Sequence, residues 1–233
     1  FVQPKPGAPE WLGLSPVIWL ILAGGVALAT FIAWENRRIA EDKGALFDPT
    51  LLKNIGLRGG VVSFFFMFMV QAGLFFCVPL FLSIALGLSA IETGVRLLPL
   101  SLSLLIFAAG IPRLLPDVSP RKVVRFGFMS LFAGLVLLVG LLEVGSGPAI
   151  ITWPLLLAGA GLGAMASQLG SVTVSAAPEK LAPEVGGLQN TASQFGASLG
   201  TALAGSVLIA ALTTSFLSGI AQDPDVPSQV VDQ

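Results

Sequence analysis

Residues 185–212 read VGGLQNTASQFGASLGTALAGSVLIAAL and carry no charged side chain. The stretch is longer than the ~20 residues that an α-helix needs to cross a bilayer. At about 100° per residue, small and polar residues fall on one narrow stripe: Gln189, Ser193, Gly196, Gly200 and Ala204. A second arc is also polar or small: Asn190, Gln194, Ser198, Thr201 and Gly205. The bulky apolar residues form the remaining face: Leu188, Phe195, Leu199 and Leu203.

This pattern differs from that of a helix surrounded by lipid. Polar groups inside a bilayer must find partners on other helices, and small residues let two backbones approach closely. The stretch therefore predicts a helix held inside a membrane bundle with a narrow lipid face. Gly196 and Gly200 are predicted to be packing residues.

The composition supports a membrane protein. Of the 233 residues, 55% are hydrophobic and 11% are charged, which excludes an average soluble globular composition. The formal net charge of −1 gives no reason to expect a nucleic-acid partner. Cys77 is the single cysteine and histidine is absent, so neither an internal disulfide nor a Cys/His metal cluster is expected. Since the sequence shows no catalytic constellation, we expect no enzyme activity, no metal and no cofactor.

The expected fold is all-α, a polytopic membrane helix bundle. Residues 1–34 are expected to form an outer loop and one transmembrane helix over 15–34, and residues 35–60 a polar connecting segment. The bundle is expected to cover 61–217, with helices at about 61–86, 93–115, 123–142, 149–176 and 185–212, followed by an outer polar tail over 218–233. In the helix over 149–176, Gly159 and Gly163 have the spacing of packing residues. Within the connecting segment, Phe47, Leu51, Leu52 and Ile55 could share one side of a short amphipathic helix, and an ordinary loop is the alternative.

The distribution of Lys and Arg predicts the orientation. Ten of the twelve lie in the segments after the first, third and fifth expected helices, or in the helix ends that border those segments. Only Lys5 and Arg96 lie on the other side. Because positive residues favour the cytoplasmic side, those three segments are predicted to be cytoplasmic. Glu92 and Arg96, four residues apart at the outer side, are expected to form a solvated surface pair.

Several motifs together resemble one family. Residues 92–99 read ETGVRLLP, residues 183–191 read PEVGGLQNT, and residues 194–201 read QFGASLGT. Residues 117–122 read DVSPRK, where Val118 and Pro120 replace the Arg and Gly of the usual cytoplasmic loop motif. In order and spacing these motifs are similar to those of the fourteen-span drug:proton antiporters of the major facilitator superfamily. The resemblance implies one linker helix followed by five of the six helices of the C-terminal bundle.

The resemblance also implies a function. It implies a multi-pass protein of a cell membrane, the bacterial inner membrane, that exports drugs or other amphipathic compounds in exchange for protons by alternating access. Its partners would be membrane lipids, the substrate, protons and an N-terminal bundle outside residues 1–233. Two alternatives stay open: a major facilitator transporter of a metabolite or siderophore, and a non-transporting membrane scaffold protein.

The resemblance and the depth of particular side chains suggest a substrate cavity. In the family, the helices that correspond to 61–86 and 149–176 line it. Gln71 and Gln168 each lie about ten residues from the cytoplasmic end of their helix, which is ~12–15 Å deep. Neutral amides at that depth could bind a ligand or join helices. Three further residues are candidates for an adaptable apolar wall: Phe68, Phe75 and Met165.

The charged residues of the same helices lie near their ends. Asp117 and Arg121 are candidates for a gating loop, and a simple turn aspartate is the alternative for Asp117. No Asp or Glu falls in the middle of the five bundle helices. The acid that carries a proton is therefore expected outside them, and residues 1–233 alone are not expected to transport.

The orientation can be tested with reporters fused at Lys43, Asp117 and Lys180. A reporter that works only in the cytoplasm should be active at all three positions, because all three lie on the side with ten of the twelve Lys and Arg residues. Activity of a periplasm-specific reporter at two of the three positions would reject this topology.

Overall fold

The computed structural model describes residues 16–41, 53–84, 86–141 and 149–222. It has six α-helices and a short 3-10 helix, η2 (Glu179–Leu181), and these residues contain no strand. In chain order the helices are α1 (Pro16–Ala40), α2 (Ile55–Ile84), α3 (Ala90–Leu114), α4 (Pro120–Leu141), α5 (Thr152–Val174) and α6 (Ala182–Gln222). All six are long and apolar enough to cross a membrane. The expected all-α membrane bundle is confirmed.

The largest differences from the expected helix ends are in three places. α1 continues through the charged residues to Ala40, because Arg37 and Arg38 are good helix formers and suit the negative end of the helix dipole. α2 begins at Ile55 rather than at 61, and α6 continues to Gln222 rather than ending near 212. The polar segment between α1 and α2 is therefore shorter than expected. The candidate amphipathic helix within it lies mostly outside the described residues.

Asn54 determines where α2 begins. Its side-chain Oδ1 accepts hydrogen bonds from the backbone N–H groups of Gly56 and Leu57, at 2.9 and 3.3 Å. These are the groups that a helix start leaves without intrahelical partners. Its Nδ2 donates to the carbonyl oxygen of Ala176 at 2.6 Å, just beyond the end of α5. One side chain thus caps α2 and ties it to α5.

α5 is the centre of the bundle and the most buried of the six helices. Its glycines meet the backbones of two neighbours. A Cβ built on Gly159 or Gly163 would overlap the carbonyl oxygens of Leu100 or Leu104 on α3, and one on Gly161 would overlap the backbone of α4. These contacts leave no room for a side chain, so the glycines set how closely α3 and α4 approach α5.

α4 also packs closely against α5, through glycines of its own. A Cβ built on Gly127 would lie 2.6 Å from Met165 Cγ, and one on Gly134 would lie 2.7 Å from the backbone nitrogen of Ala158. Ser130 Oγ donates to the carbonyl oxygen of Leu157 at 2.8 Å. Close backbone approach and an interhelical hydrogen bond therefore hold this pair together.

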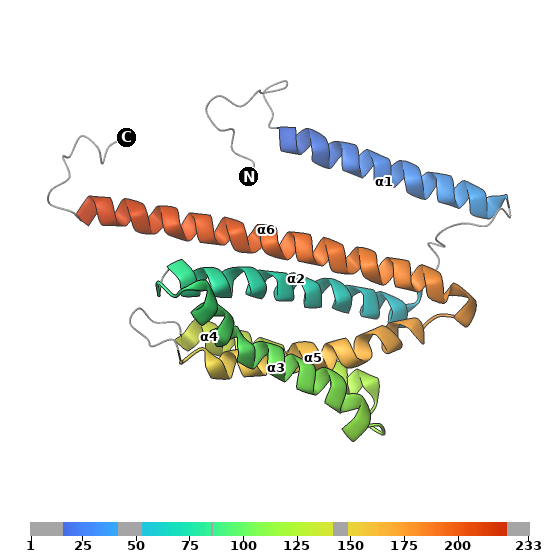
Figure 1. Cartoon of the computed structure of the whole chain (residues 1–233). Coiled ribbons are helices and arrows are strands. Elements are labelled where there is room, and N and C mark those ends of the chain that lie inside the picture. The colour runs from blue at the N-terminus through green and yellow to red at the C-terminus, as the bar shows by residue number, and fades with distance from the viewer. Residues whose placement is uncertain (1–15, 42–52, 85, 142–148, 223–233) are drawn as a thin grey trace.

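α6 packs along α2 (Figure 1). Here Gly196 and Gly200 lie against the carbonyl oxygens of Phe65 and Met69, with no space for a Cβ. The rings of Phe65 and Phe195 lie 5.8 Å apart between centroids. The second polar arc of α6 points away from α2: Asn190, Gln194, Ser198 and Thr201 are all exposed.

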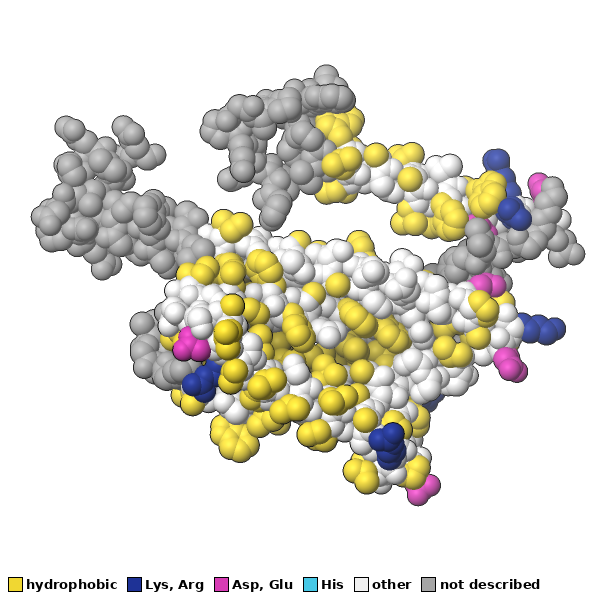
Figure 2. All heavy atoms as spheres, viewed as in Figure 1, with side chains coloured by type: hydrophobic (Ala, Val, Ile, Leu, Met, Phe, Trp, Pro, Cys, Tyr) yellow, Lys and Arg dark blue, Asp and Glu magenta, His cyan; other side chains and the backbone are white. Residues whose placement is uncertain are grey.

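The charged ends of the helices enclose an apolar middle. In Figure 2, hydrophobic side chains cover the centre of the visible face, and Lys, Arg, Asp and Glu lie towards the two ends. α1 lies apart from the other helices in Figure 1, and its apolar side chains are exposed over its length. Lipid or other protein surface must cover such a helix in a membrane.

The start of α3 shows how Glu92 is held. Glu92 has a charge interaction with Arg96, as expected of a solvated pair, and forms no salt bridge with it among the described residues. Its carboxylate accepts hydrogen bonds from the backbone N–H and the hydroxyl of Ser89, at 2.9 and 2.7 Å, while Ser89 Oγ accepts from the Glu92 N–H. This is a capping box. The spacing of four residues allows Glu92 to approach Arg96. The capping box instead gives hydrogen-bond partners to backbone N–H groups at the start of the helix.

The packing of α6 on α2 can be tested by adding a side chain. Gly200→Leu should lower stability by about 3 kcal/mol or more, because the new side chain meets backbone atoms of Met69 that cannot move away cheaply. Folded protein recovered after heating in detergent measures the loss.

Two controls separate packing from helix propensity. A Cβ on Gly187 meets nothing within 4 Å, so Gly187→Leu should leave the amount of folded protein near the wild-type level. Leu199→Val should also be mild. Equal losses in Gly200→Leu and Gly187→Leu would show that the described contact is not what holds α6.

Candidate functional site

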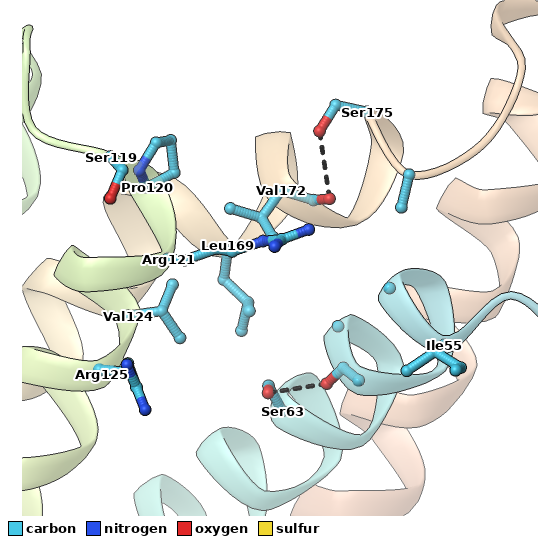
Figure 3. Close-up of a pocket in the computed structure, with 14 residues that line it drawn as sticks. Ile55, Ser63, Ser119, Pro120, Arg121, Val124, Arg125, Leu169, Val172 and Ser175 are labelled. Atoms are coloured by element: carbon cyan, nitrogen blue, oxygen red, sulfur yellow. Dashed lines mark hydrogen bonds between the residues drawn. The ribbon is translucent and has the colours of Figure 1, made fainter.

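A cavity with a volume of about 710 Å³ lies between α2, α4 and α5 in the described part of the chain. It opens near the start of α2, the start of α4 and the end of α5 (Figure 3). The lining residues are Ile55, Gly56, Gly59, Gly60, Ser63, Ser119, Pro120, Arg121, Val124, Arg125, Leu169, Val172, Ser175 and Ala176. This volume is within the range of small-molecule sites.

Glycines of α2 form one wall of this cavity. A Cβ at Gly59 would meet nothing within 4 Å, so that side of the helix is open. Gly60 lies against the Thr173 side chain, and Thr173 Oγ1 is held by the Leu169 carbonyl oxygen at 2.7 Å. α2 therefore touches α5 at Gly60 and leaves space beside Gly59.

Two arginines of α4 line the cavity. Figure 3 shows Arg121 reaching towards Leu169 and Val172, with Arg125 one turn deeper along α4. Neither forms an ion pair or a hydrogen bond with the residues that the structure describes, and no Asp or Glu lines the cavity. Its charge is therefore positive.

Two further cavities between α2 and α4 are almost wholly apolar. One, of about 350 Å³, is lined by Val62, Ser63, Phe66, Val70, Phe128, Leu131, Phe132 and Leu135. The other, of about 610 Å³, also reaches α6 and is lined by Val70, Gly73, Leu74, Cys77, Val78, Phe81, Leu135, Leu138, Val139, Ile151, Ala204, Val207 and Leu208. Their walls suit lipid chains or apolar side chains rather than polar chemistry.

Gln71 lies on another side of α2, on a strip with Phe64, Phe68 and Phe75. These residues are spaced at i, i+4, i+7 and i+11 and so share one helix face. The rings of Phe64 and Phe68 are stacked with centroids 6.3 Å apart, and Phe75 is 45% exposed. We call these four residues the α2 strip.

Gln71 itself has an unsatisfied acceptor. The residue is half-buried, its Oε1 is buried, and no donor among the described residues reaches that oxygen. Inside a membrane span such an oxygen costs free energy until it receives a hydrogen bond.

The structure places Met165 and Gln168 differently. Met165 is fully buried against Gly127 of α4, in the hydrophobic cluster against which Phe64 and Phe68 of the α2 strip also pack. Gln168 lies one turn beyond Ala164, which packs with Ile111 and Val123 of α3 and α4. Gln168 therefore lies on the side of α5 towards α3 and α4. A role for these two residues in substrate binding stays a prediction.

The two gating candidates, Asp117 in the loop before α4 and Arg121 in α4, lie in different surroundings. Arg121 lines the large cavity, whereas Asp117 is exposed and does not line it. The two form no salt bridge within the described residues. Arg125 completes the positive cavity, although from the sequence alone it is only one of the ten Lys and Arg residues on the predicted cytoplasmic side. Its spacing of four from Arg121 on an expected helix was the available signal.

Comparisons with known proteins agree on one family. The family model described as Major Facilitator Superfamily matches residues 8–201. The tetracenomycin C resistance and export protein of Streptomyces glaucescens is 34% identical over 207 residues, which cover 85% of this chain and 36% of that protein. The lincomycin resistance protein LmrB of Listeria monocytogenes is 28% identical over 212 residues, which cover 90% of this chain and 43% of that protein.

A third relative has a similar description. The probable actinorhodin transporter of Streptomyces coelicolor is 26% identical over 219 residues, covering 92% of this chain and 37% of that protein. The chain thus spans less than half the length of each of these relatives. No solved structure matches it at a significant level. With six membrane-length helices, these matches make the chain a multi-pass membrane protein of bacterial type.

Access to the large cavity can be tested by thiol labelling in a Cys77→Ser background. Ser175→Cys, which lines the cavity and is exposed, should react roughly tenfold faster with a membrane-impermeant maleimide than Ser130→Cys, because reaction needs an exposed thiolate. Ser130 is the matched control, since it is buried between α4 and α5. Similar rates at both positions in inside-out membrane vesicles would contradict an open cavity.

Proposed function

Because the chain belongs to the major facilitator superfamily, we propose that it forms part of a transporter that exports amphipathic small molecules in exchange for protons. The proposed mechanism is alternating access, in which two bundles rock about a site near the middle of the membrane. In this proposal α2–α6 supply one side of the site.

The observation that carries the proposal is the buried Oε1 of Gln71 on the α2 strip. A neutral amide can exchange hydrogen bonds with a ligand without the cost of a buried charge. A ligand that donates an N–H or O–H to Oε1 would remove the penalty of the unsatisfied acceptor. The predicted substrate therefore carries a hydrogen-bond donor.

The phenylalanines beside Gln71 support an amphipathic substrate. Phe68 is half-buried and Phe75 is 45% exposed, so both can offer ring faces to an apolar or aromatic group. Contacts with aromatic rings do not require one exact ligand shape, because a ligand can shift across the ring faces. A strip of this kind favours a class of compounds over one compound, in keeping with relatives described by tetracenomycin C and lincomycin resistance.

Proton coupling depends on an acid that α2–α6 do not provide. The Asp and Glu residues described in these five helices and their connections lie at helix ends: Glu92, Asp117, Glu179 and Glu184. A proton carrier in a transporter is usually an acid within the membrane. We therefore assign coupling to a group outside these five helices, and substrate contact to the α2 strip.

Transport can be measured with the protein in its natural length, in inside-out vesicles from cells that lack other exporters. When the vesicle interior is made acidic, a fluorescent amphipathic dye should accumulate inside in a saturable way. A protonophore should abolish the accumulation. Dye uptake equal to that of vesicles without the protein, for several chemically distinct dyes, would reject the proposed function.

The two glutamines test where the substrate binds. Gln71→Ala should change the relative export of several dyes by roughly fivefold, because it removes one hydrogen bond worth ~1 kcal/mol, and expression should stay near wild type. Gln168→Ala is the matched comparison, because it removes the same group on the side of α5 that faces α3 and α4.

The export profiles of the two variants show which glutamine contacts the substrate. An altered export profile in Gln71→Ala alone supports the α2 strip as the contact surface. An altered profile in Gln168→Ala alone would move the site to α5 and contradict the assignment, while unchanged profiles in both would make both residues structural.

A further inference from the structure

Backbone contacts divide the five helices α2–α6 into two groups. α6 lies against α2 through Gly196 and Gly200, with the carbonyl oxygens of α2 directly opposite. α3 and α4 lie against α5 through glycines as well, and Ser103 Oγ of α3 donates to the carbonyl oxygen of Leu156 at 2.7 Å. We call α2 with α6 the α2/α6 unit, and α3 with α4 and α5 the α3–α5 unit.

Each of these units is expected to move as one body. A contact between a glycine and a carbonyl oxygen contains no side chain that could change its rotamer and so absorb a displacement. A shift of one backbone along the other would therefore cost close packing at once. Within the α2/α6 unit the tilted rings of Phe65 and Phe195 add a further contact.

The two units meet each other in a different way along most of their length. Met67, Leu74, Val78 and Leu82 of α2 are buried in one hydrophobic cluster with side chains of the α3–α5 unit. In the described part of the α3–α5 unit, no glycine lies against α2 or α6. Helices that meet only through side chains can slide past each other by small amounts, because the side chains repack.

One end of the bundle is the exception, where α2 begins and α5 ends. Gly60 lies against the Thr173 side chain, and a Cβ built on Gly56 would lie 3.3 Å from that of Ala176. Asn54, which caps α2, donates to the carbonyl oxygen of Ala176 at 2.6 Å. We call these five residues the Asn54 joint, because they fix the start of α2 on the end of α5.

α6 is held at the same end. Gln189 Nε2 donates to the carbonyl oxygen of Gly170 on α5 at 3.3 Å. Leu57 of α2 and Val185 of α6 are fully buried together in a small hydrophobic cluster beside the joint. From there onward α6 follows α2 and separates from α5 (Figure 1).

The opposite end of the α2/α6 unit is held more weakly. Ser83 Oγ of α2 and Thr93 Oγ1 of α3 lie 3.4 Å apart, longer than the roughly 2.5–3.0 Å of a strong O–H···O bond. No glycine of α2 meets the α3–α5 unit beyond Gly60 in the described residues. Residues 85–89 connect α2 to α3 here, so any separation is limited to the reach of a short loop.

We propose that the α2/α6 unit pivots as one body about the Asn54 joint, so that α2 and α3 separate at the opposite end. Gly60 and Ser83 are about 35 Å apart along α2, so a rotation of about 5° moves Ser83 by ~3 Å and Gln71 by ~1.4 Å. Such a movement breaks the contact of Ser83 with Thr93 and shifts the α2 strip relative to α5. The role of this pivot in export rests on the proposed transport function.

Spin-label distances test the pivot without a transport assay. The natural-length protein is used in lipid nanodiscs, in a Cys77→Ser background, so that all of its helices are present. Labels at Ile91→Cys and Ile209→Cys join the two units, and labels at Ile84→Cys and Ile209→Cys lie within the α2/α6 unit; all three positions are exposed. The 91–209 distribution should be broader by about 3 Å, because the unit pivots even without substrate. Equal widths for both pairs, with and without an amphipathic dye, would overturn the proposal.

Two disulfides should leave the pivot free. Gly73→Cys/Ala204→Cys lies within the α2/α6 unit, where a Cβ on Gly73 would lie 3.9 Å from that of Ala204, a separation suited to a disulfide. Gly56→Cys/Ala176→Cys lies in the Asn54 joint itself. Each variant is compared with itself before and after oxidation, and its rate of dye export in vesicles should not change.

A third disulfide should stop the pivot. Ser83→Cys/Thr93→Cys joins the two units at the end that is predicted to open, and its oxidation should lower the rate of dye export on the order of tenfold. Unchanged export after this disulfide has formed, or export lost on oxidation of either control variant, would contradict the pivot. Export absent before oxidation in all variants and in the Cys77→Ser parent would instead reject the transport proposal, and the spin-label widths would still decide whether the unit pivots.

Discussion

The structure depends on direct contact between helix backbones at glycines. This contact occurs at two helix pairs. Gly159 and Gly163 of α5 lie against carbonyl oxygens of α3, and Gly196 and Gly200 of α6 lie against those of α2. In lipid there is no hydrophobic force that drives apolar helices together, so close van der Waals contact and interhelical hydrogen bonds must hold them. Where glycine is absent, side chains keep the helices apart and leave space.

Both candidate surfaces, the α2 strip and the positive cavity, follow from this distribution of contacts. α2 is held on one side by α6 and near its start by α5, through Gly60 and the Asn54 cap. We propose that the face with Gln71 contacts a ligand, and the space beside Gly59 forms the positive cavity. The two surfaces have opposite chemistry, a neutral amide among aromatic rings and a pair of guanidinium groups among aliphatic side chains. They therefore suit different molecules.

The sequence predicts the helices well because length and hydropathy decide a membrane span, and period 3.6 groups the small residues of α6 on one stripe. Which helix meets that stripe depends on tertiary packing, so α2 as the neighbour of Gly196 could not be deduced. The same limit applies to Gln168, whose depth is readable from sequence but whose direction depends on how α5 is rotated. The role of Arg125 also emerges only when α2 and α5 supply the other walls.

The central claim, that glycine contacts hold α6 on α2, can be measured by cross-linking in a Cys77→Ser background. Phe65→Cys and Phe195→Cys replace rings whose centroids lie 5.8 Å apart, and a short bifunctional thiol reagent should join them. Cysteines at Phe65 and Phe132 should not be joined, because Phe132 is on the exposed side of α4. The account predicts that adding Gly200→Leu abolishes the Phe65–Phe195 product and that adding Gly187→Leu does not. Full cross-linking in the presence of Gly200→Leu, or none in its absence, would contradict it.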